Sequence, residues 1–584
     1  MLTKCSRTAL AAAFAVIGAV CVFFGAPLPP GGSGVTAVFY AVILLPVFFA
    51  AIRYAIPLAK GEPLIYSVIL GAFFSICSVT GTELFIGDTL DLSFIGVTKK
   101  LLLSAGIAPA AISLTLIAIR LLTERLTLKE QRLTPAKTFF FSGGTILLLW
   151  LPCFIAFFPG IYSYDIPTQI EGISYGTLTS DHPLLHTVIV WWCLRLGAAL
   201  HSYTLGAAIY SFLQMCVLSA SFAAAIAYMN KKNVSPKIQL AALAWFALVP
   251  MNPLFAINVT KDVLFAAFTL LFFIQTAELV SNPKSSISSP RFWVLYVLTV
   301  AVMSLVRNTG IYPFLMLIPI TVALVTSKRV RILLLCILCA VSFFASNAIL
   351  GRVLDVKEGR FTEILSVPLQ QVARCARDGA LNEEELAEVE KFIPREIWQQ
   401  YSSRLADQIK NYVDREYLEE NFGEFLRLWS RLGFKHSGCY LKAFLGLNIG
   451  YWYPAMQYPD TRTWHDYIET IIKPITAEVM IYDLNFWPEM RELYQNIAKT
   501  TVFEAEPISA TLHKPGIYFW ATLVLFSAAI IKRDRTSVTL TAFLLISWLM
   551  QMFSPIALLR YVYPFIVCIP TVIGTISENN KKSG

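Results

Sequence analysis

The stretch TFFFSGGTILLLWLPCFIAFFPGIYSYDIPTQ, residues 138–169, decides the fold class because it joins an apolar run to an acid-bearing loop. The run before Pro159 is about 20 residues long, enough to cross the hydrocarbon core of a membrane as a helix. Pro159 and Gly160 end the run, and Asp165 follows in the loop. Ionisable side chains beside a membrane span are costly and commonly functional. The loop 157–187 is therefore the first candidate for a functional site.

Apolar runs of this kind recur along the whole chain. Of its 584 residues, 56% are hydrophobic and 15% are charged, which lies outside the composition of ordinary soluble proteins. We count about 14 such runs and predict an all-α polytopic membrane protein. The runs lie near residues 8–25, 36–57, 63–86, 100–120, 138–158, 204–228, 237–254, 262–280, 291–306, 311–327, 329–349, 515–531, 536–553 and 556–575.

The placement of basic residues predicts the orientation of these spans. Segment 182–200 is apolar but short, and reading it as a juxtamembrane helix places the basic loops on one side, which should be the cytoplasm. The loops are 120–137, 229–237, 281–291, 328–331 and 532–535, with the Lys581-Lys582 tail. Both termini are then cytoplasmic and residues 350–514, with 25 acidic against 19 basic residues, lie outside. Basic residues dispersed over short loops argue against nucleic-acid binding.

Four parts follow from this topology. They are a four-span N-terminal extension (1–122), a membrane core (138–349) with its outer loop (159–203), a small helical extracytoplasmic domain (350–514) and three closing spans (515–575). We expect the extension to serve as a scaffold or partner contact, because none of its loops concentrates ionisable residues. Cys375 and Cys439, the two cysteines of the outer domain, could pair in an oxidising compartment or stay free.

The candidate catalytic residues all fall on the outer side. Asp165 lies in the first large loop, Lys261 and Asp262 open one span, Arg307 ends another, and Arg560 lies one turn into the last. A carboxylate can orient or deprotonate an acceptor hydroxyl, while Lys and Arg stabilise a departing phosphate. Structural explanations stay open for each of them. Asp165 could be a solvated turn residue, and Asp262 could complement the helix dipole at the start of its span. Arg307 and Arg560 could extend to lipid headgroups.

Other ligand classes receive less support from the sequence. His182 and His186 share a helix face at i and i+4 and could bind a metal, but no third ligand is evident, so we predict no zinc site. The chain has neither GxxxxGK[ST] nor GxGxxG, so a soluble nucleotide site is not indicated. A lipid-phosphate donor would need no such site.

The arrangement resembles the membrane glycosyltransferases of the GT-C superfamily, which includes protein O-mannosyltransferases and lipid A aminoarabinose transferases. In that group one acid lies in the first outer loop and a second opens a later span. Asp165 in PGIYSYDIPTQ and Asp262 in VPMNPLFAINVTKDVLFAAF match these two places. The chain departs from better-known members in its N-terminal extension and in Ile166, which follows Asp165 where the mannosyltransferases have an Asp-Glu pair.

The fuller pattern looks closer to a family of large uncharacterised bacterial membrane proteins of this superfamily. The segments that carry this resemblance are SYDIPTQ, DHPLLHT, TKDVLF, SLVRNTGIYPF, SVPLQQVARC and LRYVYPF. They add candidate substrate-binding residues, namely Gln169, His182, His186, Gln370, Gln371 and Arg374.

The resemblance implies transfer of a sugar from a polyprenyl-phosphate donor to a cell-envelope glycan, lipid or protein at the outer face of the bacterial cytoplasmic membrane. Asp165 would act on the acceptor, Asp262 would assist, with Mg²⁺ or Mn²⁺ as an open option, and Lys261, Arg307 and Arg560 would hold the phosphate. Three rivals remain: a flippase or transporter of lipid-linked glycans, a glycan polymerase or ligase, and a receptor or scaffold. A transporter predicts ionisable residues near the middle of spans.

Overall fold

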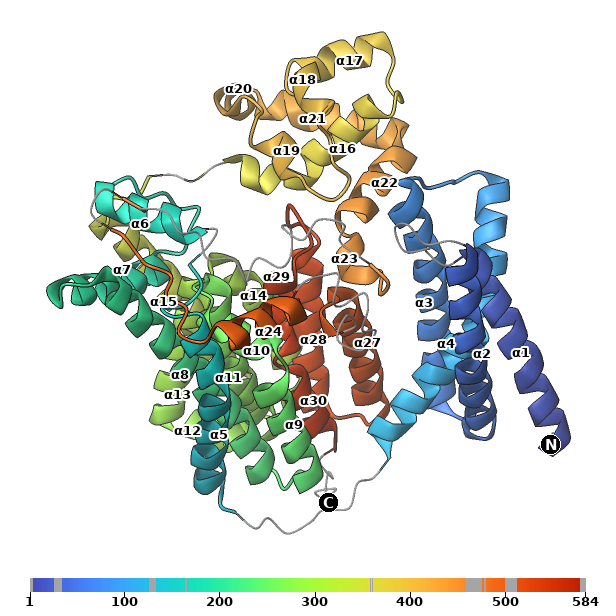
Figure 1. Ribbon diagram of the computed structural model, residues 1–584, viewed down its shortest axis with the longest axis horizontal. Coiled ribbons are helices and arrows are strands. Elements are labelled where there is room, and N and C mark those ends of the chain that lie inside the picture. The colour runs from blue at the N-terminus through green and yellow to red at the C-terminus, as the bar shows by residue number, and fades with distance from the viewer. Residues whose placement is uncertain are drawn as a thin grey trace.

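The computed structural model describes residues 4–25, 34–124, 133–162, 165–357, 359, 361–456, 475–476, 479–498 and 512–577. Over these residues the chain folds into helices, and its strand-like pairing is limited to isolated bridges. The predicted all-α class is confirmed. Figure 1 shows a helical membrane part, a separate group of N-terminal helices beside it, and a helical domain above both.

Each of the apolar runs is a helix or a pair of helices. They are α1 (Lys4–Gly25), α2 (Gly34–Ala55), α3 (Glu62–Gly87), α4 (Phe94–Thr123), α5 (Pro135–Ala156), α8 (Tyr203–Lys231), α9 (Pro236–Leu248) with α10 (Met251–Ile257), α11 (Lys261–Ser281), α13 (Pro290–Val306), α14 (Ile311–Leu324), α15 (Arg329–Val353), α27 (Pro515–Ile531), α28 (Arg535–Gln551), and α29 (Leu559–Ile566) with α30 (Ile569–Ser577).

The number of helices fit to span a membrane is smaller than the number of runs. Among the described residues eight helices are long and apolar enough, or nine if α9 and α10, bent by 53°, form one span. Several apolar helices are shorter than a spanning helix. Helices α13 and α14, for example, have 17 and 14 residues, and the chain breaks between them at η2 (Asn308–Gly310). The count of 14 spans stays a prediction.

Helix α11 and the C-terminal pair α29 and α30 form the centre of the membrane part. About three quarters of the apolar stretch is buried in α11 (72%) and in the α29–α30 pair (78%), against 28% in α5 and in α15. Helix α11 packs against α8, α13, α28 and α29. The first residues of α11 and α29 are therefore held by packing on several sides, which matters because both carry candidate site residues.

The N-terminal helices α1 to α4 pack mainly against one another. They meet the rest of the chain at α27, at α30, at residues 449–452 and at the outer domain. In Figure 1 they lie to the right of the core, and the N- and C-terminal ends of the described chain both point away from the outer domain. The cytoplasmic side of the two termini stays a prediction.

The outer domain has its own hydrophobic core between Leu365 and Tyr440. Its helices are α16 (Ser366–Arg377), α17 (Glu383–Glu390), α18 (Arg395–Trp398), α19 (Asp407–Lys410), α20 (Arg415–Glu420), α21 (Phe422–Lys435) and α22 (Ser437–Leu447). Cys375 on α16 and Cys439 on α22 are free thiols on two helices that pack against each other. Whether they pair stays an open question of the sequence.

The membrane-facing end of this segment differs from the predicted domain 350–514. Helix α23 (Ile449–Trp452) packs on α27, and α24 (Pro488–Ala498) packs on α5. These pieces bury apolar side chains against membrane helices instead of joining the core of the outer domain. The independently packed domain thus covers about residues 361–447.

Helix α7 (Leu184–Ala199) matches the segment that was expected to be juxtamembrane. It is apolar, 16 residues long and below the length of a spanning helix. It packs against α8, α13 and α15, and in Figure 1 it lies at the left edge of the helical bundle. Close contact between Gly197 and Gly206 brings α7 against α8, where a Cβ on either glycine would meet the facing backbone.

Candidate functional site

Backbone pairing brings the first outer loop to the start of α11. The Ile161 N–H donates to the Ile257 carbonyl (3.0 Å), and the Val259 N–H donates to the Ile161 carbonyl (2.9 Å). Gly160 has a φ of +125°, and a Cβ there would collide with Ser211 Oγ and the Ile257 carbonyl oxygen. The loop is thereby held beside the turn that precedes α11, and helix α6 (Asp165–Tyr175) begins next to it.

Asp165 meets two cations that come from other helices. Its Oδ2 lies 2.9 Å from Lys261 Nζ, at the start of α11, and 3.9 Å from Arg560 Nη1, in the first turn of α29. Burial disfavours the charged form of Asp165, but the charges of Lys261 and Arg560 outweigh burial and hold its pKa below the ordinary value. The Asp165 side chain remains 30% exposed, so a substrate can reach an ionised carboxylate.

Asp262, the next residue after Lys261, is directed into the protein. It is fully buried and pairs with Arg307 at the end of α13. The Thr260 hydroxyl caps α11 by accepting from the Asp262 N–H and donates to Asp262 Oδ2 (3.1 Å). Arg307 also donates through Nε to Thr309 (3.2 Å). The expected phosphate ligand Arg307 is therefore engaged by a buried acid.

Tyr561 connects the two ion pairs and was missed in the sequence. Its ring lies 5.1 Å from the Arg307 guanidinium and 5.0 Å from that of Arg560. A cation over an aromatic ring is attracted by the partial negative charge of the ring face. The position of Tyr561 directly after Arg560 in LRYVYPF was the signal available, but adjacency in sequence does not reveal a contact with Arg307 on another helix.

A buried chain of hydrogen bonds lies behind the acid. His186 Nδ1 is 3.0 Å from Gln169 Oε1, and its Nε2 is 2.9 Å from the Tyr210 hydroxyl. Tyr210 donates to Gln214 (3.0 Å), which in turn donates to the carbonyl oxygens of Ala256 in α10 and of Asn258 just after it (3.0 and 2.7 Å). Gln169 and His186 thus act as positioning residues, and Tyr210 and Gln214 join them. Tyr210 and Gln214 lie one turn apart on the apolar helix α8, and this spacing could have indicated them in the sequence.

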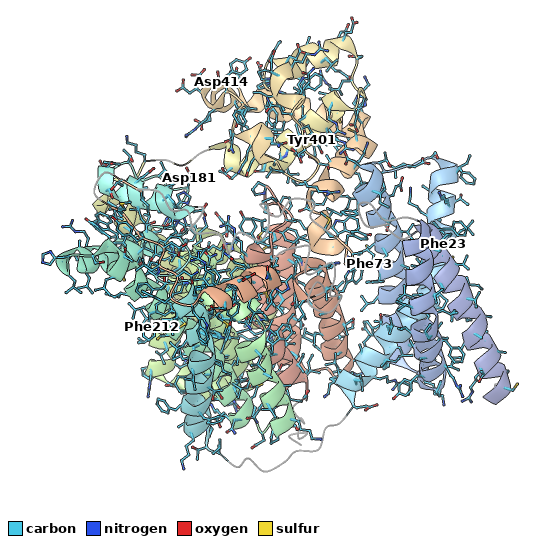
Figure 2. The ribbon with its side chains drawn as sticks, viewed as in Figure 1. Phe23, Phe73, Asp181, Phe212, Tyr401 and Asp414 are labelled. Carbon is cyan, nitrogen blue, oxygen red and sulfur yellow. The ribbon has the colours of Figure 1, made fainter. Side chains whose placement is uncertain are left out.

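His182 lies near Asp165 without belonging to that chain. Among the described residues its buried Nδ1 has no hydrogen-bond partner. Burial and then the charge of Lys261 lower its pKa, against the attraction of Asp165, Asp181 and Glu363. His182 is thus held neutral next to the acid. Asp181, one residue earlier, is labelled beside α6 in Figure 2.

The sequence profile of one protein family matches residues 164–584, which hold all of these site residues. The chain belongs to this family, DUF6020, described as a family of unknown function. No curated protein and no solved structure matches the chain. The DUF6020 region begins at the acid-bearing helix α6 and leaves α1 to α5 outside, although α5 packs against α8 within the core.

Three candidates of the DUF6020 region lie away from Asp165, on α16 of the outer domain. The Gln370 amide donates to the Ser402 carbonyl, and Gln371 bonds to Trp429 and to the Tyr440 carbonyl. Arg374 is fully buried and contacts Asp88, Asp378 and Tyr401, the last of which is labelled in Figure 2. These side chains hold the outer domain together and dock it on α3. The structure does not bring them to Asp165.

The charges around the two acids in the DUF6020 region do not favour a divalent cation. Asp165 faces Lys261 and Arg560, and Asp262 faces Arg307, so positive groups already occupy the carboxylate surroundings. Over the part of the chain that the structure describes, no three His, Cys, Asp or Glu side chains group as metal ligands. These side chains therefore do not fit Mg²⁺ or Mn²⁺, and neither ion takes part in the mechanism proposed below.

Proposed function

We propose that this protein is a membrane glycosyltransferase of the GT-C type. It transfers a sugar from a polyprenyl-phosphate carrier to a cell-envelope acceptor at the outer face of the bacterial cytoplasmic membrane. The observation that supports it most is the meeting of Asp165, Lys261 and Arg560, one reachable carboxylate with two cations from separate helices. In this proposal the carrier tail stays in the bilayer and its sugar meets these three side chains at the helix ends.

The reaction divides the three side chains between acceptor and donor. Asp165 takes the proton of the acceptor hydroxyl, whose oxygen forms a bond to the anomeric carbon. The bond from that carbon to the phosphate oxygen breaks, and its electron pair stays on the polyprenyl phosphate. Lys261 and Arg560 stabilise the charge on that leaving group. Asp262 and Arg307 hold the start of α11 and the Tyr561 ring in place.

Donor binding also explains how a carboxylate with a lowered pKa can serve as a base. In the free protein Lys261 and Arg560 both attract the Asp165 carboxylate, which opposes its protonation. A donor phosphate competes for the same two cations. Once they turn toward the phosphate, the pKa of Asp165 rises and the carboxylate can accept a proton.

The test is turnover of purified full-length protein in nanodiscs with a panel of radiolabelled polyprenyl-phosphate sugars. Asp165→Asn should lower donor consumption by about 10²- to 10⁴-fold, the usual contribution of a general base. The matched control is Glu171→Gln, because Glu171 is an exposed carboxylate on the same helix. The control should keep wild-type turnover, and both variants should elute as folded protein.

Two outcomes would overturn the proposal. Full activity of Asp165→Asn would remove the base from Asp165. Binding of lipid-linked oligosaccharides without consumption of any donor would favour the flippase or polymerase alternative.

A further inference from the structure

Residues 479–498 return from the outer domain to the membrane core, and we call them the strap. The strap consists of an extended part, 479–487, followed by α24. The Leu484 N–H donates to the Phe158 carbonyl (2.8 Å), just past α5, and the Tyr482 N–H donates to Thr204 Oγ1 (3.0 Å), at the start of α8. In Figure 1 it is the orange chain that passes from the region of α6 and α7 to α24. The strap therefore lies against the outer ends of two apolar helices.

Side chains of residues 479–484 alternate between protein and surroundings, as in a strand with one buried face, and residues 484–487, Asn485 among them, are all exposed. Val479 and Ile481 are 1% and 6% exposed and belong to one hydrophobic cluster with Ile166 and Ile170 of α6. The alternate positions carry large apolar side chains that are exposed, namely Met480 (42%), Tyr482 (53%), Leu484 (39%) and Phe486 (62%). The outward face is thus apolar at every position.

The strap is anchored by an ion pair on its inner side. Arg491 of α24 donates to both oxygens of Asp483 (2.9 and 2.5 Å), and the Asp483 side chain is 5% exposed. The Arg491 guanidinium also lies 4.9 Å from the Phe157 ring, which contacts Tyr494. These contacts turn the charges of Asp483 and Arg491 inward, while Glu489 and Glu492 of α24 stay exposed, so the apolar face of the extended part carries no charge.

A row of aromatic rings makes this face continuous with the outside of the membrane helices. Phe486 lies 5.3 Å from Phe158, Phe158 lies 5.7 Å from Phe154, and Phe154 lies 6.0 Å from Phe212, measured between ring centroids. Phe212 on α8 is 43% exposed and is labelled on the side of the helical bundle in Figure 2. Exposed apolar side chains on α5 and α8 face lipid if these helices span the membrane.

We propose that the extended part of the strap lies in the membrane–water interface of the outer leaflet, with Met480, Tyr482, Leu484 and Phe486 in contact with lipid. Aromatic side chains favour this depth because the ring is apolar and one end can remain hydrated. An exposed apolar patch of this kind in water would promote association. The cluster shared with α6 places the lipid surface close to the helix that begins with Asp165.

Added tryptophans test this contact without any assay of activity. Phe486→Trp is compared with Phe434→Trp, where Phe434 is 90% exposed on α21 of the outer domain. Full-length protein is placed in nanodiscs of phosphatidylcholine with either plain or brominated acyl chains, and the wild-type emission is subtracted. The reporter at 486 should be quenched by bromine and shifted to shorter wavelength. The reporter at 434 should emit equally in both lipids.

Equal emission of the 486 reporter in the two lipids would overturn the proposal and leave a protein partner or water on this face. If Phe486→Trp does not elute as folded protein, Tyr482→Trp gives the same reading from the same face. The outcome is independent of the proposed transferase function, because a strap in lipid and an inactive Asp165 are compatible observations.

Discussion

Asp165 and Asp262 are both carboxylates beside cations, yet their surroundings assign them different tasks. Asp165 is 30% exposed and faces Lys261 and Arg560. Asp262 is fully buried, and its partner Arg307 is 8% exposed. A buried pair of this type is expensive to break, because the remaining charge stays uncompensated in a dry place.

Removal of either partner of the buried pair should therefore destabilise the protein. We expect Asp262→Ala and Arg307→Ala each to cost about 3–5 kcal/mol, and the double variant to cost much less than the sum. Thermal or denaturant unfolding in detergent measures these costs. The control is Glu388→Ala, which removes an exposed partner of Arg431 and should cost at most about 1 kcal/mol. Additive single-variant effects would contradict the pairing.

The pH dependence of stability should involve His182 more than Asp165 near neutral pH. Burial and Lys261 lower the pKa of His182 in the folded chain, whereas the unfolded chain protonates near pH 6.5. The unfolded state then binds more protons, so stability falls as the pH drops through about 6.5. Asp165, whose pKa is also lowered, adds stability that is lost only below about pH 4.

His182→Gln should accordingly lose less stability than the wild type between pH 7.5 and 5.5. Buried His186, whose pKa is lowered to about 3 by burial, stays in the variant and keeps part of the acid sensitivity. Melting temperatures across this range provide the measurement, with His201→Asn at an exposed position as the control. Identical pH profiles for wild type and His182→Gln would refute the assignment.

Helices α6, α7 and α8 reach the start of α11 through the buried chain from Gln169 to Gln214. Hydrogen bonds in such a place matter chiefly because a missing partner leaves a buried polar atom unsatisfied. The chain also fixes the ring of His186, which has a partner on each nitrogen. It is the link through which the position of α6 depends on the α10–α11 loop.

Tyr210→Phe should weaken this link by removing one hydroxyl. We expect a loss of about 1–3 kcal/mol, because His186 Nε2 and Gln214 Oε1 each lose a partner. Hydrogen exchange at the amides of Ile161 and Val259 should rise as well. The control is Tyr175→Phe on α6, where the tyrosine is 62% exposed. Unchanged exchange in Tyr210→Phe would show that the backbone bridge does not depend on the chain.

The N-terminal helices and the outer domain meet at Asp88, the residue after α3. Arg374 of the outer domain donates to Asp88 Oδ1 (2.8 Å) and to the Asp88 carbonyl (2.6 Å), and Arg377 reaches Oδ2 (3.1 Å). Arg404 donates to the Phe85 carbonyl nearby (2.8 Å). The N-terminal helices are thereby bound to the outer domain, and their role as a scaffold stays a prediction.

Asp88→Asn should loosen this junction without disturbing the core. We expect a cost of about 1–3 kcal/mol, since the buried guanidinium of Arg374 loses an anion but keeps Asp378. Faster hydrogen exchange should be confined to the end of α3 and to α16. The control is Glu384→Gln, at an exposed position in the first turn of α17. Faster exchange throughout α11 would contradict a local role.

The helical class and the places of the apolar helices could be predicted because hydrophobic runs and basic loops are local properties of the chain. The same holds for Asp165, Lys261 and Arg560, whose placement at helix ends already suggested one outer site. Contacts between distant segments could not be predicted in this way. Three such contacts are the pairing of Arg307 with Asp262, the position of Tyr561 between two arginines, and the contact of α16 with the end of α3. The packing of whole helices determines which of these polar groups meet.

The return of the strap to the core is the clearest case of this division. Residues 479–484 alternate between inward and outward side chains, yet all but Asp483 are apolar or aromatic, so the sequence alone does not distinguish a buried strand from one at a membrane surface. Their hydrogen bonds to Phe158 and Thr204 set which face is inside. Local hydrophobicity thus determines that a segment leaves water, and long-range packing determines what it touches when it does.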